Sequence, residues 1–184
     1  MNMNKTIAVL VGSLRKDSYN LKVAKVLEHL APSTLTLKII QIGDLPLYNE
    51  DIDTDNPPAS YTRFRQELMT CQGVIFVTPE YNRSVPAVIK NAIDVGSRPY
   101  GKSVWGKKPA AIISVSPGAI GGFGANHHLR QSLVFLDMPT MQQPEAYFGG
   151  VANVFDENGN IADKSKSFLQ QFIDAYAAWV QKTA

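Results

Sequence analysis

Residues 7–20 read Ile-Ala-Val-Leu-Val-Gly-Ser-Leu-Arg-Lys-Asp-Ser-Tyr-Asn, and this stretch decides the fold. The continuous apolar run 7–11 predicts a buried strand that ends at Gly12. A short loop rich in hydroxyl and amide groups follows, and a helix is predicted to begin at about Ser18. Because a helix start carries unpaired N–H groups and a partial positive charge, this unit favours phosphate binding.

The side chains of the loop strengthen that interpretation. Neutral hydrogen-bond donors can come from Ser13, Ser18 and Asn20. The guanidinium of Arg15 can add two parallel, positively charged N–H donors. The later glycines of a dinucleotide-binding fingerprint are replaced by other residues, so the backbone cannot approach a pyrophosphate as closely. A terminal phosphomonoester fits this loop better than a bridging phosphate.

Strand and helix patterns alternate along the rest of the chain. Strands are predicted at 5–11, 35–41, 73–78, 109–115 and 140–143, and helices at 18–30, 58–71, 86–95, 126–136 and 164–182. A long polar loop covers residues 43–58. Near-continuous apolar strands separated by helices predict a parallel sheet covered on both faces.

Length and composition limit the class of protein. A chain of 184 residues with 45% hydrophobic and 18% charged residues fits one globular domain, residues 1–184. The net charge of +2 gives no reason to expect nucleic acid or a membrane as partner. The single cysteine, Cys71, permits no intrachain disulfide, and no apolar run approaches the roughly 20 residues of a membrane helix. We therefore expect a cytoplasmic protein.

Three loops follow strands of the predicted sheet and should meet at one site. In parallel sheets, ligands bind beyond the carboxyl ends of the strands, so loops 12–18, 78–85 and 116–124 are expected to lie together. In the second loop Pro79 has no N–H, so the backbone of residues 80–82 must supply donors to a planar ligand edge. The third loop holds four glycines, which allow close approach and flexing around a substrate.

Other motifs fail on their context. Residues 96–103 match the P-loop pattern, but they follow a predicted helix and precede a strand, which is the reverse of the order that a P-loop needs. The acidic run 51–55 lacks the glycine and glutamate of an EF-hand and is expected to be a solvated loop. His127 and His128 are adjacent, so on a helix they point in different directions and cannot share a metal. We predict no metal site.

The three loops, in this order, resemble the NADPH-dependent FMN reductase family, the flavodoxin-like group of quinone, azo-dye and chromate reductases. The resemblance covers almost the whole chain. It is carried by Gly12-Ser13-Leu14-Arg15 with Ser18 and Asn20, by Pro79-Glu80-Tyr81-Asn82-Arg83-Ser84-Val85-Pro86 with Lys90-Asn91-Ala92-Ile93-Asp94, and by Ser116 with Gly121-Gly122 and His128-Leu129-Arg130-Gln131. The Pro-Glu-Tyr-Asn loop followed by Lys-Asn-Ala-Ile-Asp is its most specific part.

The resemblance implies a fold, a cofactor and an assembly. The fold is a flavodoxin-like, doubly wound, five-stranded parallel sheet of order 2-1-3-4-5 with helices on both faces. The cofactor is FMN, with its phosphate in the first loop and its ring edge against the second, and the assembly is a homodimer or homotetramer. The expected cofactor-binding residues are Ser13, Arg15, Ser18, Tyr19, Asn20, Pro79, Glu80, Tyr81, Asn82 and Ser116.

The implied activity is an FMN-dependent NAD(P)H oxidoreductase that works by a ping-pong cycle. NADPH or NADH is the co-substrate, and the acceptor is a small molecule: a quinone, an azo compound, chromate or free flavin. Hydride transfer runs through flavin N5, so no catalytic side chain is expected. Two alternatives remain open, a flavodoxin-type electron-transfer protein and a non-enzymatic sensor of a phosphorylated ligand.

Overall fold

The computed structural model describes residues 4–156 and 160–184. Its sheet contains β1 (Lys5–Val11), β2 (Leu35–Ile39), β3 (Gly73–Thr78), β4 (Ala110–Val115) and β5 (Ala146–Phe148). All neighbouring pairs are parallel, and the strand order is β2-β1-β3-β4-β5. The predicted doubly wound parallel sheet of order 2-1-3-4-5 is confirmed.

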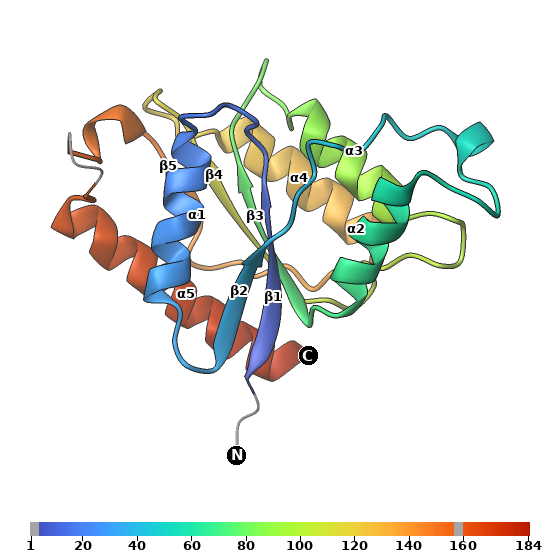
Figure 1. The fold of residues 1–184 in the computed structure, drawn as a ribbon. Coiled ribbons are helices and arrows are strands. Elements are labelled where there is room, and N and C mark those ends of the chain that lie inside the picture. Colours follow the sequence, from blue (N-terminus) through green and yellow to red (C-terminus); the bar gives the residue numbers. More distant parts are fainter. Residues whose placement is uncertain (1–3, 157–159) are drawn as a thin grey trace.

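Helices cover both faces of this sheet (Figure 1). They are α1 (Tyr19–Leu30), α2 (Ala59–Met69), α3 (Ala87–Gly96), α4 (Phe123–Phe135) and α5 (Asp163–Thr183), with short 3-10 turns η1 (Glu50–Ile52) and η2 (Val151–Asn153). α1 and α5 lie on one face, whereas α2, α3 and α4 lie on the other. Within the described residues, no helix has the length and apolar character that a bilayer crossing requires.

The hydrophobic core has two layers because alternate side chains of each strand point to opposite faces. In β1, Ile7 and Val9 are fully buried in the layer with α1 and α5. Ala8 and Leu10 are fully buried in the layer with α2, α3 and α4. A strand buried on both faces must be apolar throughout, which explains the continuous run that opens the chain.

The last strand lies later than the sequence pattern predicts. The chain at 139–141 pairs only with the first residue of β4: the Ala110 N–H donates to the Pro139 carbonyl at 3.0 Å, and the Met141 N–H donates to the Ala110 carbonyl at 2.8 Å. Regular pairing resumes at Ala146. The prediction of a strand at 140–143 was therefore wrong in position. Met141 is buried, but its backbone pairs with Ala110 alone and does not begin a strand.

The prediction for the acidic loop also needs correction. The acidic loop is not fully solvated, because the Asp53 side chain is 2% exposed and its carboxylate accepts two hydrogen bonds from Arg65 at 2.8 and 2.7 Å. This buried pair ties the loop to α2.

The start of α4 also differs from the prediction. α4 begins at Phe123, three residues before the predicted start at Asn126, because Gly121 and Gly122 form the preceding turn with positive φ.

Candidate functional site

The first and second loops meet at the carboxyl edge of the sheet, the upper edge in Figure 1. The Gly12 N–H donates to the Val77 carbonyl at 2.8 Å, which extends the pairing of β1 and β3 by one residue. A Cβ on Gly12 would lie 2.9 Å from Pro79 Cδ and from Ile89 Cδ1. Only glycine lets the two loops approach this closely, so Gly12 sets the distance between them.

The first loop presents unpaired backbone donors. The N–H groups of residues 13–17 donate to no acceptor in the described part of the chain. Ser18 is the N-cap of α1, and its Oγ accepts the Leu21 N–H at 3.2 Å. The Ser18 hydroxyl hydrogen is still available, since this bond uses only the oxygen lone pair. The loop and helix start together form a concave set of donors suited to an anion.

Asn20 carries the strongest sign of a missing ligand. The residue is 5% exposed, and its Oδ1 is the one buried side-chain polar atom without a partner that the described residues contain. Leaving a buried polar group unpaired costs about 1–3 kcal/mol. Rotation of the amide by half a turn exchanges its oxygen and nitrogen, so the same position can offer a donor to phosphate.

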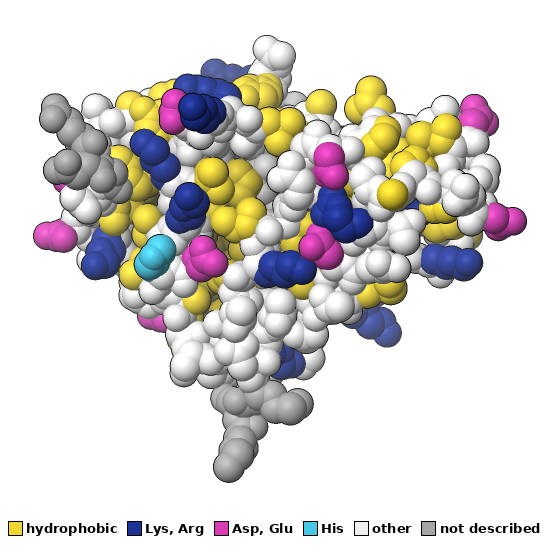
Figure 2. Space-filling model, in the orientation of Figure 1, with side chains coloured by type: hydrophobic (Ala, Val, Ile, Leu, Met, Phe, Trp, Pro, Cys, Tyr) yellow, Lys and Arg dark blue, Asp and Glu magenta, His cyan; other side chains and the backbone are white. Residues whose placement is uncertain are grey.

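Arg15 is exposed and forms no ion pair with any described residue. It lines a pocket of about 240 Å³ together with Ser13 from the same loop. Residues 40–42, which follow β2, form the other wall. Figure 2 shows Lys and Arg side chains along the upper edge of the molecule, above the start of α1. Of the predicted set, Ser13 and Arg15 line this pocket, whereas Ser18 is the N-cap of α1 and Asn20 lies in its first turn.

Tyr19 packs on the outer side of α1. Its ring stacks on Phe155 with centroids 6.5 Å apart, and Lys22 Nζ lies 5.5 Å from the Tyr19 ring and 5.7 Å from the Phe155 ring. This contact attaches the start of α1 to the segment after η2. A role of Tyr19 in cofactor binding stays a prediction.

The second loop is a tight turn. The Tyr81 N–H donates to the Ser84 carbonyl at 3.1 Å, and the Ser84 N–H donates to the Tyr81 carbonyl at 2.9 Å. Asn82 and Arg83 between them have positive φ of 51° and 63°. Because the turn uses the Tyr81 N–H, the donors among residues 80–82 without an acceptor in the described chain are those of Glu80 and Asn82. The prediction that Tyr81 also supplies a backbone donor did not include this turn.

The third loop is packed firmly, although its glycines suggested flexing. A Cβ on Gly121 would lie 2.6 Å from the Tyr147 carbonyl carbon, and one on Gly149 would lie 2.6 Å from the Ala119 oxygen. The Gly118 N–H donates to Ser116 Oγ at 3.1 Å. These glycines therefore allow the loop to rest directly on the end of β5, and Ser116 helps to hold its bend.

A ring cluster beside the third loop was not predicted. The ring centroids of Phe123 and His127 are 4.2 Å apart, those of Phe123 and Tyr147 are 5.2 Å apart, and His127 Nε2 lies 2.8 Å from the Tyr147 hydroxyl. Burial is the main cause that raises the pKa of Tyr147 to about 12, so its hydroxyl stays protonated at neutral pH. The cluster joins α4 to β5. The His127–Tyr147 contact spans 20 residues of sequence, so no local pattern predicts it.

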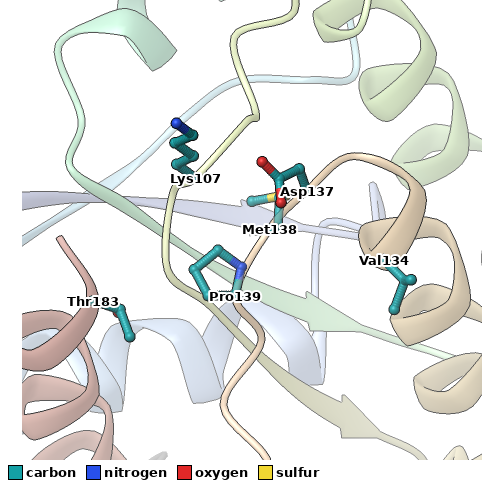
Figure 3. A pocket seen from close by; sticks show the side chains of 6 residues that line it. All are labelled: Lys107, Val134, Asp137, Met138, Pro139 and Thr183. Atoms are coloured by element: carbon teal, nitrogen blue, oxygen red, sulfur yellow. The ribbon is translucent and has the colours of Figure 1, made fainter.

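A larger pocket lies at the opposite, amino end of the sheet (Figure 3). It measures about 530 Å³ and is lined by Lys107, Val134, Asp137, Met138, Pro139 and Thr183. Backbone groups around it are paired: the Lys107 N–H donates to the Asp137 carbonyl at 2.7 Å, and the Met138 N–H donates to the Leu133 carbonyl at 3.2 Å. None of the residues predicted to bind the cofactor lines this pocket.

Comparison with known proteins identifies the family to which this arrangement corresponds. The family model for NADPH-dependent FMN reductase matches residues 5–153. A quinone reductase from Pseudomonas putida is 64% identical over 181 residues, covering 98% of this chain and 97% of that protein. A 2-hydroxy-1,4-benzoquinone reductase from Burkholderia sp is 49% identical over 176 residues, covering 95% and 96%. The structure of FerB, a flavoenzyme NAD(P)H:(acceptor) oxidoreductase from Paracoccus denitrificans, matches with a TM-score of 0.91 at 45% identity, covering 97% and 98%.

Proposed function

The chain belongs to the NADPH-dependent FMN reductase family and is an FMN-dependent NAD(P)H oxidoreductase, and we propose that it reduces quinones at the carboxyl edge of its sheet. The observation that carries this placement is the unmet hydrogen bonding of the first loop. The N–H groups of residues 13–17 have no acceptor in the described chain, and residues 14–17 are exposed, whereas Asn20 Oδ1 is buried and has no partner. A bound phosphate would accept hydrogen bonds from these N–H groups, and from the Asn20 amide once its NH2 takes the place of the oxygen.

The residues present fit FMN. A phosphomonoester needs several donors and a positive charge, and the first loop offers Ser13, Arg15, Ser18 and Asn20 together with the helix start. For the ring, the free N–H groups of Glu80 and Asn82 lie in the second loop, and Ser116 lies in the third. We propose that these groups hold the flavin, with the phosphate in the first loop.

FMN, when bound, supplies the hydride chemistry that connects a nicotinamide with an acceptor. The chain contributes binding and electrostatics. Backbone donors of the second loop favour negative charge at the ring edge, in the way that an oxyanion hole favours a developing anion. NAD(P)H and the acceptor would bind in turn at the same exposed face of the flavin, so one would leave before the other binds. No side chain of the protein would have to act as acid or base.

A quinone is the acceptor that the arrangement supports best. Two relatives are named for quinone reduction. The exposed ring of Phe123 and the half-buried ring of Tyr147 add an apolar wall beside the third loop, against which a flat molecule can stack. Family membership and a net charge of only +2 disfavour the flavodoxin-type carrier, and the enzyme class disfavours the sensor.

We further propose that one domain of 184 residues assembles in the cytoplasm as a homodimer or homotetramer. The surface of α3 and α4 supports the assembly. Phe135 is 87% exposed and Val134 is 76% exposed. Phe135 borders a hollow of about 540 Å³ that also holds Lys90 and Asp94, so the surface presents apolar area with charges of both signs. Light scattering of the purified protein measures its molar mass and so tests the proposed dimer or tetramer.

Anaerobic spectroscopy of the purified holoprotein tests the reductase directly. NADPH or NADH should bleach the flavin absorbance without any added protein, and a stoichiometric amount of benzoquinone should restore it. Holoprotein mixed with benzoquinone alone is the control and should not change. Absence of bleaching with either nucleotide would contradict the proposed function.

A further inference from the structure

The side chain of Glu80 connects the second loop to α4. α4 follows Gly122, which has a φ of 76° and provides no side-chain cap. Instead, Glu80 Oε2 accepts the Ala125 N–H at 3.0 Å, across 45 residues of sequence. The N–H groups at a helix start have no partner within the helix, so the Glu80 carboxylate fills the place of a cap.

The surroundings of Glu80 suit this role. Its side chain is 12% exposed, and its second oxygen, Oε1, lies 3.5 Å from Arg83 Nη1. A helix start carries partial positive charge, which stabilises a carboxylate placed there. A hydrogen bond with a charged partner is stronger than one between neutral groups, and solvent screens it less when it is mostly buried.

Gly124 allows the first turn of α4 to approach the second loop. A Cβ at this position would lie 2.6 Å from the Arg83 oxygen and 3.0 Å from Glu80 Oε2. A second contact lies one turn further on, where Ser84 Oγ is 3.0 Å from His128 Nδ1. The second loop and the start of α4 are therefore packed as one unit.

We propose that Glu80 is a positioning residue of this reductase: by capping α4, its carboxylate fixes the backbone of residues 79–82 in the orientation that binds FMN. This inference rests on the proposed function. From the sequence, Glu80 is expected to act only through its backbone, whereas the geometry gives its side chain a separate role. Glu80 acts through α4 and through its own loop, and its carboxylate takes no part in electron transfer.

Two substitutions separate this role from general stability. Glu80→Ala removes the cap, whereas Glu80→Gln keeps an oxygen of the same shape and removes the charge. We expect Glu80→Ala to weaken FMN binding by about fivefold to thirtyfold, the equivalent of one lost cap, and Glu80→Gln to stay within about threefold of the native protein. Glu67, which pairs with Arg63 and Lys38 on α2 away from the loops, provides matched controls as Glu67→Ala and Glu67→Gln.

The experiment combines titration of apoprotein with FMN and amide hydrogen exchange of the same apoproteins. Glu80→Ala should lose exchange protection at the Ala125 and Asn126 amides while the strands keep theirs, and Glu80→Gln should restore most of it. Native dissociation constants or native protection in Glu80→Ala would overturn the proposal. So would a Glu80→Gln protein as impaired as Glu80→Ala. If the native protein bound no FMN, the proposed function would fail instead, and exchange would still decide whether Glu80 caps α4.

Discussion

The two ends of the sheet each carry a hollow, but their polar groups differ. At the amino end, the pocket of Figure 3 has about 530 Å³, and its backbone groups are paired, as between Lys107 and Asp137. At the carboxyl end, the pocket beside the first loop has only about 240 Å³. There the N–H groups of residues 13–17 find no acceptor in the described chain, and Asn20 Oδ1 has no partner.

This difference shows that pocket size alone is a poor guide to function. Folded chains pair nearly all of their buried polar groups, because an unpaired one is costly. Asn20 Oδ1 is the one buried side-chain atom of this kind in the described chain, and it lies beside a loop whose N–H groups have no protein acceptor. We therefore infer that the carboxyl edge is the functional end of the sheet, and substitutions at the two ends should have unequal effects.

The largest effect is expected from a glycine of the third loop. Gly121→Ala should lower the free energy of unfolding by about 2–5 kcal/mol, because it adds left-handed strain and brings a Cβ to 2.6 Å from the Tyr147 backbone. Gly101, which has φ of 79° and no neighbour within 4 Å of a Cβ, is the matched site in the loop leading to β4. Gly101→Ala should cost about 1–2 kcal/mol from strain alone. Urea unfolding measures both, and equal losses would contradict the firm packing of the third loop.

Arg15→Ala should have the next largest effect. Loss of one charge-assisted contact to phosphate costs about 1.5–3 kcal/mol, which corresponds to FMN binding weaker by about tenfold to a hundredfold. Because Arg15 is exposed and forms no ion pair in the described chain, the apoprotein should unfold at the native urea concentration. Titration of apoprotein with FMN provides the measurement. An unchanged dissociation constant would remove Arg15 from the site.

Asn20→Ala should change binding and stability in different directions. FMN binding should weaken by about twofold to tenfold, the value of one hydrogen bond. The apoprotein should be as stable as the native one or more stable, because the substitution removes a buried polar atom without a partner and improves helix propensity in α1. Urea unfolding of the apoprotein and FMN titration test the two halves. A destabilised apoprotein would show that Asn20 serves the fold rather than the ligand.

The smallest effect is expected at the amino end. Lys107→Asn changes an exposed residue of the larger pocket, and asparagine tolerates the positive φ of 64°. FMN affinity and the rate of NADPH oxidation should stay within about twofold of native, in line with the minor effect of most surface substitutions. A marked loss of FMN binding would place the cofactor at the wrong end of the sheet.

Local patterns in the sequence predict most of the fold and bring the three candidate loops to one edge of the sheet. The apolar run 7–11 and its counterparts identify the central strands, and parallel strands bring their following loops to one edge. The contacts that shape the site depend on pairings between distant residues. The Glu80–Ala125 hydrogen bond and the His127–Tyr147 contact join separate elements, so no short pattern contains them. The β5 position was missed because a three-residue strand carries little periodicity.

A crystal structure of the protein grown with excess FMN would show where the cofactor binds. We predict phosphate oxygens within hydrogen-bond distance of Ser13, Arg15, Ser18 and Asn20, with the ring edge at residues 79–82. FMN seated in the amino-end pocket, or a carboxyl edge without bound flavin at saturating concentration, would contradict it.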